Sequence, residues 1–499
     1  MAMTRRIKSV EESIRDTDEP EHRLKKNLSG LDLTVFGVGV IIGTGIFVLT
    51  GVVARDQAGP AAAISFVIAG VVCGLAALCY AEFASTVPVA GSAYTFSYAT
   101  FGEFIAWIIG WDLVLELALG AATVAVGWSG YLQQLLDDVG ISLPTSIAGE
   151  EARFNIPAIL IVLAMTAVLV LGIKLSSRVT AVIVAIKVAI VLLIVVVGVF
   201  YLTADNYSPF VPPAQPAGEG EGGWHSPLIE LLGFSQGTYG WGGVVAGASI
   251  VFFAFIGFDI VATAAEETRD PKRDLPRGIL GSLVLCTLLY VAVSLVVVGM
   301  QNYTELSATA PLAGAFSSVG LTAFSTIISI GALAGLTSVV MILMLGQSRV
   351  LFAMSRDRLL PPGLAKVHPR YGTPYRITIA TGLVVAVLAG LVPLDTLAEM
   401  VNIGTLFAFL LVSVGVLVLR RTRPDLPRAF RVPLVPALPI VSALACFWLM
   451  LNLPADTWLR FVVWMAIGLG VYWLYSWQHS RLATRDVEAR TPEPAHPEG

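Results

Sequence analysis

The chain contains 499 residues, of which 56% are hydrophobic and 13% are charged, and its formal net charge is −4. A soluble domain carries about 25% charged residues, so this composition excludes a soluble enzyme, a disordered protein and a coiled coil. It predicts a protein whose main solvent is lipid. The slight negative net charge gives no indication of nucleic acid as a partner.

In chain order, the first element is a polar tail, residues 1–30, which lacks the apolar centre of a signal peptide. Twelve mostly apolar stretches follow. Their lengths are comparable to that of a helix that crosses a bilayer, which needs about 20 residues. They are residues 31–52, 60–83, 102–133, 155–173, 179–203, 243–265, 279–300, 321–348, 376–392, 396–419, 434–453 and 457–478. Because these runs are long and do not alternate, they exclude a β-barrel. We expect an all-α integral membrane protein with about twelve transmembrane helices.

Basic residues indicate which side of the membrane each loop faces. If the N-terminus is cytoplasmic and the spans alternate, 27 of the 31 Lys and Arg residues fall on the cytoplasmic side, and Arg55, Arg153 and Arg460 fall outside. This asymmetry follows the positive-inside rule and predicts cytoplasmic N- and C-termini on a multi-pass protein of the plasma membrane. The predicted parts are the tail 1–30, a ten-helix core 31–419, a cytoplasmic loop 420–433, two accessory helices 434–478 and the tail 479–499.

Ionisable side chains at membrane depth are costly, so each is a candidate functional residue. Four lie inside the predicted spans: Asp112, Glu116, Lys187 and Asp259. Asp112 and Glu116 are four residues apart and share one face of a helix, which predicts a cavity or a cation beside them. For Asp112, pairing within the protein stays an equal alternative, whereas Glu116 and Asp259 are predicted to meet substrate or water.

Lys187 lies in the fifth stretch, about 13 Å of helix beyond Arg178. Its ammonium either extends to the cytoplasmic interface, as long basic side chains do, or lies in a dry pocket where its charge is costly. We favour the second interpretation, which predicts a lysine that gains and loses a proton.

Glycines interrupt the first and sixth stretches, at Gly43 and Gly45 beside Thr44, and at Gly257. Glycine inside a helix costs about 1 kcal/mol relative to alanine, so these positions indicate either close helix packing or breaks in the helices. Their matching places, five spans apart, favour broken helices in a transporter built from inverted repeats. The end of a broken helix attracts a carboxylate, and unwound carbonyl groups accept from an ammonium, as an α-amino acid requires.

Six stretches carry the pattern of a known family. They are IIGTGIFVLTG (41–51), LCYAEFASTVPVAGSAYTFSYATFGE (78–103), GWDLVLE (110–116), VIVAIKVAIVLL (182–193), FFAFIGFDIVATAAEETRDPKRDLPRGI (252–279) and NIGTLFAF (402–409). The chain resembles the cationic amino acid transporter family of the amino acid–polyamine–organocation superfamily, in particular its bacterial members with twelve spans. The resemblance covers about residues 28–478.

This resemblance implies a fold of the leucine-transporter type, in which spans one to five and six to ten are inverted repeats and two helices are appended. It implies a substrate site formed by both broken spans and by span three. Its residues are Ile41, Thr44, Gly45, Glu116, Phe253, Ile256 and Asp259. Lys187 matches the lysine that, in proton-coupled relatives, occupies the sodium position of sodium-coupled ones and lies between spans one, five and eight.

The expected function is therefore a proton-coupled permease of L-amino acids that works by alternating access, with no enzyme activity and with the proton in place of a cofactor. Glu116 and Asp259 favour cationic substrates such as arginine or lysine, whereas Met341 and Met344 in span eight predict a short pocket for small neutral substrates such as alanine. Both stay open, and an exchanger without net proton coupling is the alternative.

An intramembrane enzyme and an amino acid sensor are less favoured. All five histidines lie in loops or tails, and the C-terminal tail is short. The four cysteines lie in apolar runs and predict no metal site. The expected partners are the amino acid and the lipid bilayer, while a small membrane helper subunit and the oligomeric state stay open.

Overall fold

Helices form nearly all of the regular structure in the computed structural model. It describes residues 28–483 with gaps at 87–93, 95–96, 99–100, 145, 149–151, 173–176, 216–222, 234–236, 259–260, 262–267, 425, 427 and 429. Within the described residues there is no β-strand, only three isolated bridges. The prediction of an all-α protein is confirmed for this part of the chain.

Helices occupy each of the twelve predicted apolar stretches. Those of the first half are α2 (Gly30–Ile41), continued by η1 (Gly45–Leu49), α3 (Thr50–Val53), η2 (Ala54–Ala58) and η3 (Gly59–Ala61), then α4 (Ala62–Thr86), α6 (Glu103–Asp138), α7 (Ile156–Val170) and α8 (Ser177–Gly198) with η4 (Val199–Tyr201). Those of the second half are α10 (Gly240–Val251) with η7 (Phe252–Phe255), α12 (Pro271–Met300), α14 (Thr322–Arg356), α15 (Tyr375–Leu391), α16 (Leu394–Thr422), α17 (Ala437–Leu451), and α18 (Ala455–Val471) with η10 (Tyr472–Ser476) and α19 (Trp477–His479). Short helices in the loops are η5 (Ala204–Tyr207), η6 (Gly223–His225), α9 (Leu228–Leu231), η9 (Tyr303–Glu305) and α13 (Pro311–Ser318).

The outer surface of this bundle is apolar. Seven helical stretches of the described chain are long and apolar enough to cross a membrane, judged by length and composition, and five further apolar helices are shorter. Large aliphatic side chains on the outward faces are more than half exposed, among them Val196, Leu288, Val387, Leu444 and Val462. A soluble protein rarely exposes so much apolar surface, so these faces lie against lipid and the protein crosses the membrane several times.

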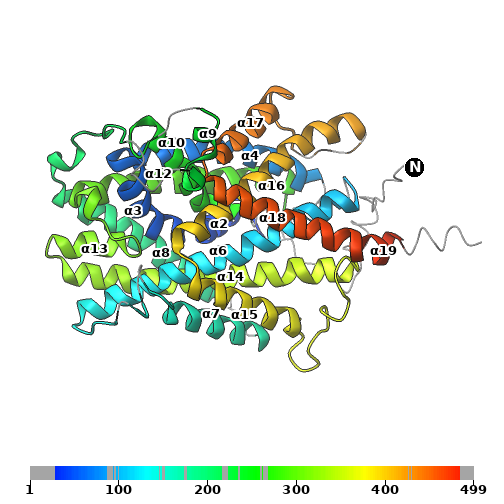
Figure 1. Cartoon of the computed structure of the whole chain (residues 1–499), viewed down its shortest axis with the longest axis horizontal. Helices are drawn as coiled ribbons and strands as arrows, with labels where there is room; N and C mark the ends of the chain where they lie inside the picture. Colours follow the sequence, from blue (N-terminus) through cyan, green and yellow to red (C-terminus); the bar gives the residue numbers. More distant parts are fainter. Residues whose placement is uncertain are drawn as a thin grey trace, which may run out of the picture.

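The core helices pack as two groups. In one group, α12 packs on α2 and α4, and α4 packs on α10; in the other, α6, α7, α14 and α15 all pack on one another. Figure 1 shows α6 and α14 along the long axis, with α7 and α15 side by side beneath them. α8 and α16 connect the groups, since α8 contacts α12 and α14, and α16 contacts α4 and α6.

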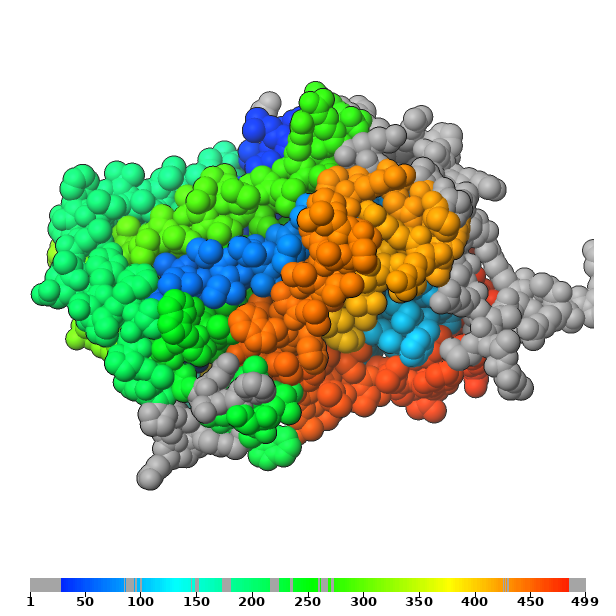
Figure 2. All heavy atoms as spheres, turned by 90° about the horizontal axis from the view of Figure 1, so that it is seen from above, coloured from blue at the N-terminus to red at the C-terminus, as the bar shows by residue number. Residues whose placement is uncertain are grey.

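The last two long helices pack on the outside of the core. α17 contacts α16 and α4, and α4 lies between α12 and α17 on the face drawn in Figure 2. α18 is joined to α6 by tryptophans: the indole N–H of Trp107 donates to the Gly468 carbonyl (2.9 Å), and that of Trp111 donates to the Trp464 carbonyl (2.9 Å). The rings of Trp111 and Trp464 stack with centroids 4.6 Å apart, so aromatic packing holds the accessory helix in place.

Candidate functional site

The helix of the first stretch is interrupted in the interior of the molecule. α2 ends at Ile41, and Ile42 adopts an extended conformation (φ −69°, ψ 99°). Its N–H still donates to the Val38 carbonyl (3.0 Å), which closes the last turn. The chain returns to helical angles at Thr44, from which a helical run continues through η1, α3 and η2 to Ala58. The first bond back along this run is from the Phe47 N–H to the Gly43 carbonyl (3.2 Å), and the N–H groups before Phe47 are those that a helix start leaves without a partner within the helix.

The helix of the sixth stretch is interrupted at the same level. α10 tightens into η7 and ends at Phe255, after which Ile256 is extended (φ −60°, ψ 137°). Gly257 has φ +118°, a conformation that side-chain-bearing residues rarely adopt. Only a glycine adopts this backbone conformation without strain.

The two interruptions lie against each other. A methyl group on Gly45 would overlap the backbone of Ala254, and one on Gly257 would lie 2.7 Å from Cγ1 of Val40. The buried Tyr290 hydroxyl on α12 is within hydrogen-bond distance of the Ile41 carbonyl (2.8 Å) and the Ala254 carbonyl (2.7 Å). Tyr290 therefore links both breaks, a role that no sequence motif indicated.

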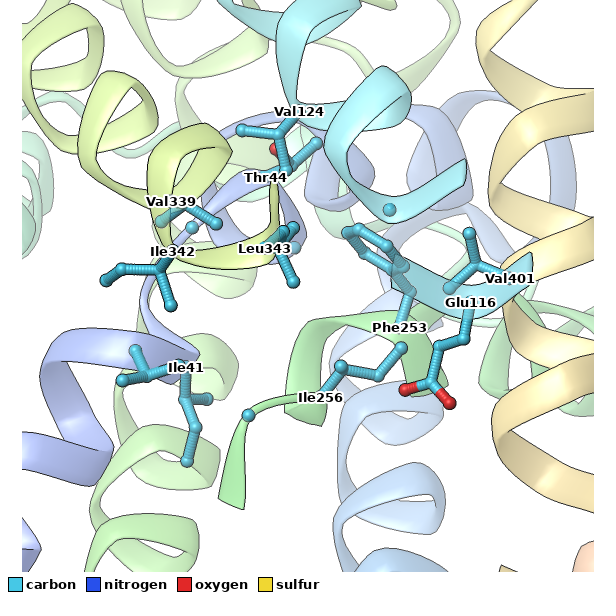
Figure 3. A pocket seen from close by; sticks show the side chains of 15 residues that line it. Ile41, Thr44, Glu116, Val124, Phe253, Ile256, Val339, Ile342, Leu343 and Val401 are labelled. Carbon is cyan, nitrogen blue, oxygen red and sulfur yellow. The ribbon is translucent and has the colours of Figure 1, made fainter. Parts of the chain in front are cut away.

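A cavity opens where the two breaks face α6, α14 and α16 (Figure 3). Its volume is about 30 Å³, room for about two water molecules, so this conformation holds no space for an amino acid. Its lining residues are Val40, Ile41, Gly43, Thr44, Gly45, Glu116, Gly120, Val124, Phe253, Ile256, Gly257, Val339, Ile342, Leu343 and Val401.

Eight of the nine candidate residues for substrate binding and helix breaking line this single cavity. They are Ile41, Gly43, Thr44, Gly45, Glu116, Phe253, Ile256 and Gly257. Asp259, the ninth, lies outside the described residues. The structure thus brings together positions up to about two hundred residues apart in sequence, because the two breaks and α6 meet at one point.

Two polar side chains face an otherwise apolar wall. The Glu116 side chain is 4% exposed, and the Thr44 hydroxyl is buried without a hydrogen-bond partner among the described residues. The remaining wall is formed by valine, isoleucine, leucine and phenylalanine side chains from α2, α6, α14 and α16 and from the second break, which Figure 3 shows around the Thr44 and Glu116 side chains. The site therefore offers few polar groups and a large apolar contact area.

The prediction of which side chains of span eight face the pocket is wrong. Met341 and Met344 were expected to shorten the pocket, but neither lines it. Val339, Ile342 and Leu343 face the cavity instead, because α14 is turned so that this stripe points inward. The residues Gly120, Val124 and Val401 complete the wall and were not anticipated from the sequence.

Lys187 lies beside the first break but outside the cavity lining. Its side chain is 1% exposed, and its ammonium nitrogen donates to the Gly39 carbonyl in the last turns of α2 (2.9 Å). Its aliphatic stem packs on Gly335 of α14, where a methyl group would lie 3.0 Å from Lys187 Cγ. The side chain thus lies between α8, α2 and α14 and does not extend to the surface.

Comparison with known proteins adds independent findings. Residues 28–472 match the family described as Amino acid permease. The chain is 48% identical over 485 residues to the branched-chain amino acid permease of Bacillus subtilis, covering 96% of this chain and 98% of that protein. It is 47% identical over 464 residues to the methylthioribose transporter of the same organism, covering 92% and 95%. It is 38% identical over 408 residues to the vacuolar cationic amino acid transporter 4 of Arabidopsis thaliana, covering 81% and 65%.

Proposed function

Because the chain belongs to the amino acid permease family of the amino acid–polyamine–organocation superfamily, we propose that it is a secondary transporter that moves neutral aliphatic L-amino acids together with protons. The resemblance identified from the six sequence motifs is confirmed by this family match. Membership of a permease family makes the chain a transporter and not an enzyme.

The observation that carries the proposal is the cavity at two facing helix breaks. The helical run that starts at Thr44 directs its first N–H groups and its positive dipole end toward this point, which suits a carboxylate. Carbonyl groups of the unwound segment at Ile256 suit an ammonium. An α-amino acid carries both groups on one carbon, so it matches both breaks at once.

The wall opposite the breaks supports an aliphatic side chain on the substrate. Val124, Val339, Ile342, Leu343 and Val401 offer only hydrocarbon, and burial of each substrate methylene there contributes about 0.8 kcal/mol. The name of the Bacillus relative at 48% identity, a branched-chain amino acid permease, agrees with this assignment.

A cationic substrate is the second candidate, because Glu116 places a carboxyl group in the wall and several plant relatives are named cationic amino acid transporters. The cationic end of such a substrate's side chain would pair with that carboxylate. Exchange of Glu116 for Gln separates the two candidates, since it removes the charge at nearly constant volume.

Lys187 supports proton coupling in this proposal. Among the described residues, its one hydrogen-bond partner is the carbonyl of Gly39, two residues before the end of α2. A protonated amine strengthens that bond and a neutral amine weakens it, so its protonation state would bias the position of α2. An exchanger without net proton movement remains the alternative, and it predicts no effect of a proton gradient on accumulation.

The proposal extends to the arrangement in the membrane. We propose that the chain crosses the plasma membrane twelve times and that both of its termini are cytoplasmic. In this arrangement spans one to five and six to ten are inverted repeats, and two helices are appended. The two helix groups of the core support it, since rocking of α2, α4, α10 and α12 against α6, α7, α14 and α15 would open the cavity to either side.

Substrate competition in proteoliposomes tests the substrate class. Vesicles loaded with unlabelled leucine take up radiolabelled leucine by counterflow, and leucine, isoleucine, alanine, arginine and methylthioribose are added outside as competitors. We expect leucine and isoleucine to compete about tenfold more strongly than arginine, with little change in this order for Glu116→Gln. Strong competition by arginine that is lost in Glu116→Gln would instead establish the cationic candidate.

A further inference from the structure

Asp112 is a buried acid that the proposed transport site does not use. It lies on α6 and is 0% exposed, and neither of its carboxyl oxygens has a hydrogen-bond partner among the described residues. Glu116, on the cavity wall, is one helical turn further along the same face. Asp112 therefore lies one turn away from the cavity in the interior of the bundle.

The described neighbour of the Asp112 carboxyl group on α16 is a glycine. Oδ1 lies against Gly404 of α16, where a methyl group would be 3.0 Å from that oxygen. The same turn of α16 carries Val401, which lines the cavity, and Asn402, whose side-chain N–H donates to the Ile250 carbonyl (2.8 Å). The contact between Asp112 and Gly404 thus belongs to the junction of the two helix groups.

Charged groups that face Asp112 from the packed helices are few. Glu116 is the described neighbour that acts on it electrostatically. On the helices packed against α6, the titratable and charged side chains lie toward the helix ends; they are Glu399, Asp395, Arg420 and Arg421 on α16, Arg349 and Arg356 on α14, Tyr375 and Arg376 on α15, and Asp456 and Arg460 on α18. α7 and α13 carry none.

An ionised carboxylate in this place lacks the partners that would offset its lost hydration. Two ionised carboxylates one helical turn apart also repel each other. The neutral acid is therefore the form compatible with the packing seen here, and ionisation requires water to reach the α6–α16 junction. A group whose proton affinity differs between two arrangements of the helix groups links proton binding to the change between them, which is the linkage that coupling needs.

We propose that Asp112 is a second proton carrier of the transport cycle, acting at the junction between α6 and α16 and distinct from Lys187. The step is transfer of one proton between water and a carboxylate oxygen of Asp112, and no bond of the substrate changes. This inference rests on the proposed proton-coupled transport and adds the group that carries the proton between the two sides.

The test compares the wild type with Asp112→Asn, which resembles the neutral acid but releases no proton. Two quantities are measured in proteoliposomes: accumulation of leucine driven by an inward proton gradient, and the rate of leucine counterflow between about pH 5.5 and 8.5. We expect Asp112→Asn to lose accumulation by tenfold or more, and its counterflow to depend less steeply on pH than that of the wild type, because Lys187 still titrates in this variant. Accumulation within twofold of the wild type, with an unchanged pH profile, would overturn the proposal.

The matched control is Glu399→Gln. Glu399 is a half-buried carboxyl group on α16 that accepts a hydrogen bond from the Thr457 hydroxyl (2.8 Å) and is not at the cavity. We expect this variant to keep both the gradient-driven accumulation and the pH profile. Loss of both in this control as well would show a general effect of removing a carboxyl group from the helix bundle and would count against a specific role of Asp112.

Asp112→Glu covers the case in which the Asn variant does not fold. This variant keeps a titratable carboxyl group in a changed position, so we expect a shifted pH midpoint of counterflow, and an unshifted midpoint contradicts the proposal. If the wild type itself shows no accumulation in a proton gradient, the proposed proton coupling fails. If the wild type accumulates leucine and Asp112→Asn does so equally, only the role of Asp112 fails.

Discussion

Among single residues, Gly120 is the one whose lack of a side chain sets the width of the cavity. A methyl group at this position would lie 3.5 Å from Leu343 Cδ1 and 3.9 Å from Phe253 Cε2. Both are ordinary van der Waals distances, so an alanine fits without strain and takes up space that a substrate side chain would otherwise occupy.

We predict that Gly120→Ala narrows specificity without loss of folding. Isoleucine and leucine should bind about tenfold more weakly, because overfilling a packed site costs about 1–3 kcal/mol, while alanine uptake should stay within about twofold. Competition counterflow measures both. Gly346→Ala is the control, because its methyl group would lie 3.7 Å from Leu117 of α6 and outside the cavity; an equal loss for alanine and isoleucine in Gly120→Ala would contradict the prediction.

The interrupted helices are the decisive elements of the site. Both breaks place backbone groups at the cavity, and the second depends on the backbone angle of Gly257. Any side chain there has to adopt φ +118° and lies 2.7 Å from Val40, so the two breaks cannot keep their contact.

Gly257→Ala should therefore abolish transport and lower thermal stability. The strained backbone alone costs about 1–3 kcal/mol, and the overlap with Val40 adds to it. Gly74→Ala on α4 is the matched control, since its methyl group would lie 3.6 Å from Leu283 in a regular helix. The melting temperature in detergent and leucine counterflow check both variants. Normal counterflow by Gly257→Ala would mean that the break tolerates a side chain.

At this scale the sequence predicts the positions of the helices well, because the length of an apolar run alone indicates a span. The breaks were also indicated, since glycine has a cost inside a helix. The face that each helix turns inward was harder to predict. α14 is apolar on nearly every side between Phe324 and Leu345, so the pattern gives no preferred direction, and Met341 was chosen where Leu343 lines the cavity. Tertiary packing decides that rotation.

For the molecule as a whole, one buried ion pair connects distant parts of the chain at the end of α4. Glu82, 1% exposed, accepts from Nε (2.9 Å) and Nη2 (2.6 Å) of Arg420 and from the Val432 N–H (2.7 Å). The side chain of Arg428 is 3.4 Å away. These contacts hold α4, the end of α16 and the following segment together.

We predict that Glu82→Gln destabilises the fold by roughly 2–3 kcal/mol, because it leaves arginine side chains without their charged partner. Asp56 pairs with Arg55 in a more exposed place. Asp56→Asn should therefore change the free energy of unfolding by less than about 1 kcal/mol. Thermal unfolding in detergent compares the two. Equal melting temperatures for both variants would show that the Glu82 contacts contribute little.

The most direct test of the account is the accumulation of radiolabelled leucine in proteoliposomes under an inward proton gradient, an inward sodium gradient or no gradient. The account predicts accumulation above the outside concentration only with the proton gradient, and equilibration without accumulation for Lys187→Ala, whose hydrogen bond to Gly39 is removed. Accumulation driven by sodium, or undiminished proton-driven accumulation by Lys187→Ala, would contradict it.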